Sequence, residues 1–199
     1  MNPETEKTRI QTAIREKYAH VSTSAIDRFA YPTGSEGARN LGYDMSLLEG
    51  VTEAMMNSFC GVGNPFSAGP VNEGEQVLDI GCGSGIDLII AARMSGETGQ
   101  VRGIDLTPEM VKLAQQNTAQ AGLSRLEILE AATEAIPYPD QSFTLVLSNG
   151  VLNLTADKEL AFTEIYRVLA PGGRVQFADI VYTGETHQDN PLTYEAWSE

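Results

Sequence analysis

The segment VLDIGCGSGID at residues 77–87 limits the fold of this chain more than any other feature. An apolar run of strand character leads directly into Gly81, Gly83 and Gly85, and a helical pattern follows them. Glycines at this spacing let the backbone turn tightly and let a ligand approach the main chain closely. The segment therefore predicts the strand–loop–helix unit of a doubly wound α/β sheet, with a ligand bound at the loop.

The chain beyond Glu73 continues with alternating strand and helix patterns. Strands are expected at residues 77–80, 101–105, 126–130, 143–148 and 174–180. Helices are expected at 87–94, 108–121 and 158–169, and a turn at 170–173. This order predicts a mostly parallel sheet with right-handed crossover connections. Ligands of such sheets bind beyond the carboxyl ends of the strands.

The first 70 residues are predicted to form a helical cap that covers the substrate, next to a ligand-binding domain at 71–199. Two helices are expected in this cap, at 5–20 and 46–59, with a loop at 31–45. A glycine- and proline-rich link at 61–70 leads into the first strand.

Two acidic residues near the glycine loop indicate which ligand binds there. Asp105 ends the second strand 20 residues after Gly85, where a carboxylate can accept hydrogen bonds from both hydroxyls of a ribose. That spacing alone also fits a nicotinamide dinucleotide. Asp79, within the first strand, would repel a pyrophosphate but could orient the ammonium group of an aminoacyl cofactor. The pair therefore favours S-adenosylmethionine, while a role as strand-end caps is the structural alternative.

Four motifs, VLDIGCGSGID, GIDLTPEM, SNGVLNL and RVLAPGG, together resemble class I methyltransferases, and specifically the arsenite methyltransferase group. The resemblance extends from about residue 40 to 182. It implies a Rossmann-like fold and S-adenosylmethionine as cofactor, with S-adenosylhomocysteine as product. The cofactor-binding residues that it implies are Tyr18, Asp79, Gly81, Gly83, Gly85, Asp105, Leu106, Thr133, Glu134 and Asn149. Asn149, at the end of the fourth strand, would face the methyl group.

The arsenic-binding part of that family does not carry over to this chain. The family binds arsenite through cysteine thiolates. Val62 and Gly150 stand where two of those cysteines would be, and Cys60 is two residues out of register. A third would lie just beyond Trp197, at the end of the chain. We therefore expect an organic methyl acceptor larger than arsenite, with Gly150 enlarging the space beside Asn149. Arsenite methylation, and an inactive cofactor-binding subunit of a heteromeric methyltransferase, are the alternatives.

No general base stands out in the sequence, because methyl transfer from a sulfonium depends mainly on positioning. The candidates for the acceptor pocket are Cys60, Asn149, Asn153 and His20. Cys60 fits a thiol contact or an apolar core position. His20 fits a proton acceptor or a surface residue. No metal ion is expected.

The composition limits the classes of partner that the chain is expected to bind. A net charge of −14 opposes binding to nucleic acid, whose recognition depends on cationic neutralisation of phosphates. No apolar run approaches the length of about 18 residues that a membrane span requires, so no membrane association is expected. The polar N-terminus and a content of two cysteines predict a cytoplasmic protein.

The C-terminal end of the predicted sheet is short. The resemblance implies a sixth and a seventh strand, but only 19 residues follow Ile180, with room for one short helix at 194–197. The fifth strand is therefore expected to present an open edge, and open edges attract pairing partners. A homo- or hetero-oligomeric partner, or a longer natural chain, is predicted to complete it.

Overall fold

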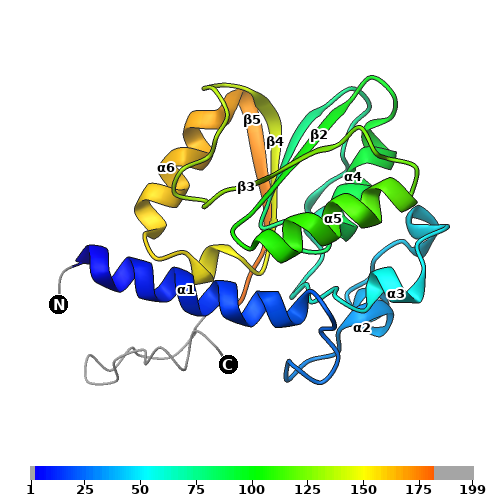
Figure 1. Cartoon of the computed structure of the whole chain (residues 1–199). Coiled ribbons are helices and arrows are strands. Elements are labelled where there is room, and N and C mark those ends of the chain that lie inside the picture. The colour runs from blue at the N-terminus through cyan, green and yellow to red at the C-terminus, as the bar shows by residue number, and fades with distance from the viewer. Residues whose placement is uncertain (1–2, 182–199) are drawn as a thin grey trace.

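The glycine-loop unit lies at the centre of a five-stranded sheet (Figure 1). The computed structural model describes residues 3–181, and side chains from residue 7 onward. Every neighbouring pair of strands is parallel, in the order β3-β2-β1-β4-β5. The strands are β1 (Gln76–Ile80), β2 (Gln100–Asp105), β3 (Glu127–Glu130), β4 (Phe143–Asn149) and β5 (Leu169–Ala178). The predicted doubly wound α/β fold is confirmed.

The crossover helices divide between the two faces of the sheet. The chain moves one way across the sheet from β1 through β2 to β3, and the other way from β4 to β5. Because parallel crossovers are right-handed, this reversal places helices on opposite faces. The helices α4 (Ile86–Ser95) and α5 (Pro108–Gln120) pack in one apolar core, and α6 (Lys158–Val168) packs in another. Figure 1 shows α6 apart from α4 and α5, with the sheet between them.

Strand β1 contributes to both cores, as expected for a strand buried on two sides. Val77 packs with the residues of α4 and α5, whereas Leu78 and Ile80 pack with those of α6. By the alternation of a strand, Asp79 points to the same side as Val77. The central strand therefore directs one carboxylate toward the side of the sheet that carries α4.

The N-terminal segment folds over the carboxyl ends of the strands. It contains α1 (Pro3–Val21), α2 (Gly34–Asn40) and α3 (Glu53–Met56), with 3₁₀ turns η1 (Met45–Leu48) and η2 (Pro65–Ala68). Its apolar side chains share a core with α4, and the end of α1 packs on α5. Figure 1 shows α1 lying across one edge of the sheet layer.

Two predictions about this segment were wrong. The expected loop at 31–45 contains the helix α2, and the expected helix at 46–59 is replaced by η1 and α3. Gly50 adopts a left-handed conformation with φ of 78°, which ends the first turn. Thr52 then caps a new helix by accepting a hydrogen bond from the backbone N–H of Met55.

The predicted turn at 170–173 lies inside the fifth strand. The pairing partner of Phe143 is Leu169, whereas that of Leu145 is already Arg174, so four residues of β5 bulge opposite Thr144. Gly172, with φ of 79°, permits this bulge. The expected helix at 194–197 and any strand after β5 lie outside the described residues. None of the helices that the structure describes has the length and apolar character needed to span a bilayer.

Candidate functional site

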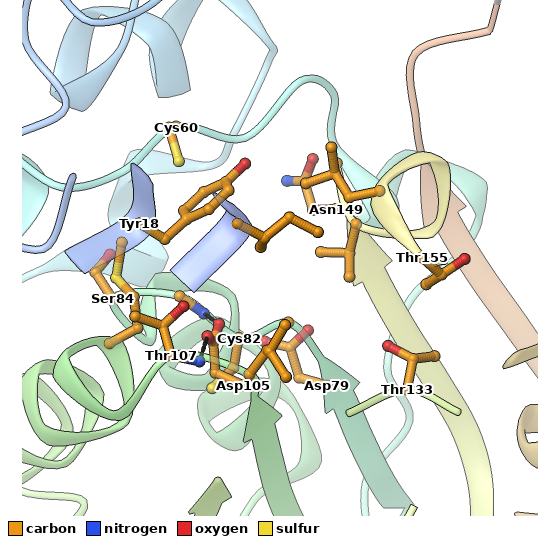
Figure 2. A pocket seen from close by; sticks show the side chains of 18 of the residues that line it. Tyr18, Cys60, Asp79, Cys82, Ser84, Asp105, Thr107, Thr133, Asn149 and Thr155 are labelled. Carbon is orange, nitrogen blue, oxygen red and sulfur yellow. Dashed lines mark hydrogen bonds between the residues drawn. The ribbon is translucent and has the colours of Figure 1, made fainter. Parts of the chain in front are cut away.

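A large pocket opens between the carboxyl ends of the strands and the N-terminal cap. It contains about 970 Å³ of space not filled by atoms, part of it open to solvent. Pockets for small molecules and cofactors usually measure several hundred Å³. In Figure 2, Asp79 and Asp105 lie at the tips of neighbouring strands, with Tyr18 and Cys60 on the opposite side of the space. The position is the one that the sheet topology predicts.

The three glycines of the loop serve different purposes. All three have positive φ angles, of 67° at Gly81, 51° at Gly83 and 83° at Gly85. A Cβ on Gly81 would lie 2.3 Å from a methyl group of Val151, so no larger residue fits. A side chain on Gly83 would meet no atom closer than 3.9 Å and would extend into the pocket. Gly85 lies against the backbone of α5 instead, outside the pocket lining.

Asp105 connects the end of β2 to the glycine loop. Its Oδ2 accepts a hydrogen bond from the N–H of Gly83 at 2.9 Å, and its Oδ1 accepts one from the N–H of Thr107 at 2.8 Å (Figure 2). Burial raises the pKa of Asp105, and these hydrogen bonds oppose that rise. A carboxylate oxygen has more than one lone pair, so both oxygens can still accept bonds from a ligand.

Asp79 is buried beside this loop, and its Oδ2 has no hydrogen-bond partner. Burial raises its pKa well above the usual range, and the carboxylates of Asp87 and Asp105 raise it further. An unpaired buried carboxylate oxygen destabilises a protein unless a donor or a cation meets it. A positively charged ligand group would stabilise the ionised form of Asp79, which burial disfavours.

The electrostatics of the pocket favour one class of ligand. The described lining includes Asp79, Asp87 and Asp105 but no lysine and no arginine. A pyrophosphate would be repelled here, whereas a ligand with a ribose and cationic groups would be attracted. This arrangement agrees with the preference derived from Asp79 in the sequence.

Four further residues from the predicted cofactor set also line the pocket: Tyr18, Leu106, Thr133 and Glu134. Burial raises the pKa of Tyr18 well above the usual range, which keeps its hydroxyl protonated. Oε1 of Glu134 accepts hydrogen bonds from the N–H groups of Ala156 and Asp157, at 3.2 and 3.4 Å. Glu134 therefore holds together two loops of the pocket wall.

Asn149 is the centre of a hydrogen-bond cluster that joins the cap to the sheet. Its Oδ1 accepts from the N–H groups of Val62 at 2.9 Å and Gly63 at 3.3 Å. Its Nδ2 donates to the hydroxyl of Tyr43 at 2.9 Å, to the carbonyl of Gly63 at 3.0 Å and to Oδ2 of Asp87 at 3.1 Å. The amide is thus committed to holding the cap in place.

Val62 and Gly150, the positions at which the resemblance places cysteines, are neighbours in space. A Cβ on Gly150 would lie 3.2 and 3.4 Å from the two methyl groups of Val62. The tertiary structure thus brings together two positions that are far apart in the sequence. Val62 therefore occupies part of the space beside Gly150, which itself lines the pocket.

The three other candidates for the acceptor pocket, Cys60, His20 and Asn153, lie in different parts of the structure. Cys60 lines the pocket, and burial, followed by the charge of Asp105, raises the pKa of its thiol to about 12. His20 is exposed at the end of α1, with Nδ1 2.7 Å from the carbonyl oxygen of Glu16, and does not line the pocket. Asn153 is also outside the lining, although its Oδ1 is buried without a partner. Of these three, only Cys60 contributes to the pocket.

Sequence reasoning missed Asp87, which lies in the pocket wall. It occupies the first turn of α4, two residues after Gly85. A carboxylate at this distance from the glycine loop was the available signal. Among residues 7–181, no cluster of histidine, cysteine and acidic side chains is suited to a metal ion.

Comparisons with known proteins agree with this geometry. The family model described as a methyltransferase domain matches residues 71–199. An arsenite methyltransferase of Halobacterium salinarum is 35% identical over 190 residues, which cover 88% of this chain and 48% of that protein. A ubiquinone/menaquinone biosynthesis C-methyltransferase of Enterobacter sp. is 38% identical over 107 residues, 53% of this chain and 42% of that protein. The chain spans about half the length of these curated relatives.

Two solved structures share the fold. An arsenic(III) S-adenosylmethionine methyltransferase from Chlamydomonas reinhardtii has a TM-score of 0.56 and 34% identity, over 75% of this chain and 50% of that one. A SAM-dependent methyltransferase from Aquifex aeolicus has a TM-score of 0.55 and 28% identity, over 64% of this chain and 69% of that one. Sequence and structure therefore lead to the same group of proteins.

Proposed function

The chain belongs to the class I S-adenosylmethionine-dependent methyltransferases, and we propose from this that it transfers a methyl group to an organic small molecule. The observation that carries the proposal is the pocket of buried carboxylates, which lacks lysine and arginine among its described lining residues. S-adenosylmethionine fits this pocket, because it has a sulfonium, an ammonium and a ribose with two hydroxyls. When bound, it supplies a methyl carbon activated by the positive sulfur.

The proposed cofactor contacts follow the strands. Asp105 and the adjacent Leu106 bind the ribose, and Asp79 orients the ammonium group. The loop of Gly81, Gly83 and Gly85 allows the close approach of the ligand. Thr133 and Glu134 lie beside the adenine, and Tyr18 covers the site from α1. Each of these residues except Gly85 lines the pocket, which supports the assignment.

An organic acceptor is favoured over arsenite by the residues opposite the cofactor. Val62 and Gly150 have no sulfur, and the thiol of Cys60, with its pKa raised to about 12, stays protonated at neutral pH. Arsenic binds to thiolates rather than to thiols. Cys60 and Asn149 both line the pocket, and we assign both to the acceptor subsite.

One other function keeps specific support. The Halobacterium salinarum relative, whose name states arsenite as its substrate, favours arsenite methylation.

The edge of the sheet supports a protein partner. β5 is the last strand in the sheet, and apolar side chains near it are exposed, namely Phe162, Val175, Phe177, Ile180 and Val181. We propose that a second subunit, identical or different, covers this edge. We further propose that residues 1–70 act as the cap over the substrate and that the protein functions in the cytoplasm. The net charge of −14 supports a small-molecule acceptor over nucleic acid.

Isothermal titration of the purified chain with S-adenosylmethionine and with S-adenosylhomocysteine tests the proposal. Light scattering on the same sample gives its mass. Micromolar binding to the chain supports the proposed function, and acceptors can then be screened. Absence of binding by a folded chain contradicts it. Binding only by an oligomer supports the partner at the β5 edge.

A further inference from the structure

The residues that line the pocket come from the ends of successive strands of the sheet. Because of this order, the residues proposed to bind the cofactor and those proposed to bind the acceptor lie on different strands. Thr133 follows β3, Asp105 ends β2, Asp79 lies in β1, and Asn149 ends β4. Under the proposed function, adenine, ribose and the aminoacyl group take the positions near β3, β2 and β1. The methyl acceptor then approaches from the β4 side, beneath the cap.

Asp87 lies on this β4 side. Its Oδ2 accepts a hydrogen bond from Nδ2 of Asn149, and the hydroxyl of Tyr43, which donates to the carbonyl of Gly63, lies close by. Its Oδ1 is buried without any hydrogen-bond partner, and the residue, 7% exposed, lines the pocket. Burial of an unpaired carboxylate oxygen is unfavourable. Within the described residues this oxygen has no partner, and Asp87 lines the pocket that a ligand would enter.

The other polar groups near the acceptor are already committed or have the wrong protonation state. The amide of Asn149 bonds to the cap, and Glu134 bonds to backbone N–H groups. Raised pKa values keep Tyr18 and Cys60 protonated at neutral pH, so they can donate a proton but cannot accept one. Asp87 remains as the carboxylate at this end with an unused oxygen.

We propose that Oδ1 of Asp87 accepts a proton from the methyl acceptor, which therefore belongs to the protic nucleophiles: amines, alcohols, phenols or enols. This inference rests on the proposed function and specifies its substrate class. In the reaction, a lone pair of the acceptor forms the bond to the methyl carbon, and the carbon–sulfur bonding pair stays on sulfur. The acceptor's proton passes to Asp87, which releases it to solvent before the next turnover.

The ionisation of Asp87 suits this role. Burial raises its pKa to about 6, although the neighbouring side chains of Asn149 and Tyr43 oppose the rise. The carboxyl group is therefore mainly ionised at neutral pH and can take up a proton. The titratable groups that face it are Asp79 from β1, Cys82 from the glycine loop, and Tyr43 and Cys60 from the cap.

A pair of cofactor analogues tests the inference without knowledge of the acceptor. Sinefungin has an amine-bearing carbon in place of the sulfur and its methyl group, so its ammonium occupies the space from which the methyl is transferred. S-adenosylhomocysteine has no group there. Titration calorimetry should show that the chain binds sinefungin about tenfold more tightly. D87N should remove this preference and leave the affinity for S-adenosylhomocysteine within about twofold.

D87N keeps one oxygen that can still accept from Nδ2 of Asn149, and thermal unfolding verifies its folding. D79N is the matched control, because it should weaken both analogues equally. The wild-type chain gives a second test that needs no variant. Its preference for sinefungin should increase from pH 5 to pH 7, as Asp87 ionises.

Each outcome bears on a different proposal. If both analogues bind equally, or if D87N keeps the preference, the role of Asp87 is wrong but the proposed function stands. If neither analogue binds to the folded wild-type chain, the proposed function fails and this inference fails with it.

Discussion

The two ends of the pocket are built by different kinds of contact. At the cofactor end, Asp105 bonds to the N–H of Gly83, 22 residues away in the sequence. At the acceptor end, Asn149 bonds to Asp87, Val62 and Tyr43. These residues lie 62, 87 and 106 positions away from it in the sequence, respectively. The glycine loop, Asp79 and Asp105 of the first end come from one β-α-β unit. The second exists only when the cap, α4 and β4 have come together.

This difference indicates at which end of the pocket a substitution can change one binding function without changing the other. The cofactor end depends on a short run of glycines and on carboxylates at fixed strand ends, so a change there affects binding directly. The acceptor end depends on the cap, where Val62 covers Gly150 through simple apolar contact. Substitutions in the cap can therefore alter the acceptor while the cofactor site remains intact. Four predictions test this division.

Loss of the Asp105 carboxylate should produce the largest effect. D105A removes the acceptor for the N–H groups of Gly83 and Thr107, and the proposed acceptor for the ribose hydroxyls. We expect the affinity for S-adenosylhomocysteine to fall about 100-fold, measured by calorimetry. E109Q, an exposed acidic residue close by, is the control. Affinity for D105A within threefold of the wild-type value would contradict the assignment.

Removal of the Asn149 amide should separate the two ends. N149A leaves the N–H of Val62 and the hydroxyl of Tyr43 without their partner, so the free energy of unfolding should fall by about 3 kcal/mol. The melting temperature should fall by about 6–12 °C. Limited proteolysis should cleave faster near residues 59–63. N40A, at an exposed residue, is the control. Unchanged stability would show that the cap is held by apolar packing alone.

The buried carboxyl of Asp87 should make stability depend on pH. Because its pKa is raised to about 6, the folded chain keeps this proton to a higher pH than the unfolded chain does. The contribution of Asp87 to the free energy of unfolding is therefore fully present below about pH 4, and it is lost as the pH rises to 6. Asp79, whose pKa is also raised, acts in the same direction.

Urea unfolding at several pH values measures this dependence. Between pH 4 and 7 the wild-type chain should lose about 1–2 kcal/mol more than D87N does. E49Q, at an exposed carboxylate, should follow the wild-type curve. Parallel curves for the wild type and D87N would show that Asp87 titrates normally.

Substitution of Cys60 should have the smallest effect on cofactor binding. Its raised pKa, about 12, keeps it protonated at neutral pH, so arsenite should not shift the melting temperature of the wild-type chain. C60S should bind S-adenosylhomocysteine within about twofold of the wild type, since the change is nearly isosteric. C82A is the matched thiol control. A stabilisation by arsenite that disappears in C60S alone would favour arsenite methylation.

The sequence predicted more of the cofactor end than of the acceptor end. The five strands, their helices and the pocket position of Asp79 and Asp105 all follow from local patterns. The cap helices were predicted poorly, because Gly50 and the Thr52 cap break the segment into short turns. Asp87 was missed although it follows the glycine loop by two residues, because its contact with Asn149, 62 residues away, forms only in the tertiary structure.

The sequence by itself determined the doubly wound sheet and the class of cofactor, and it predicted the place where the cofactor binds. These depend on backbone freedom at glycine and on the alternation of strands and helices, which act over a few residues. The tertiary structure alone decided that Val62 covers Gly150, that Asn149 holds the cap, and that an oxygen of Asp87 stays unpaired. Contacts of this kind form only when distant segments pack together, so their geometry cannot be derived from the spacing of residues along the chain.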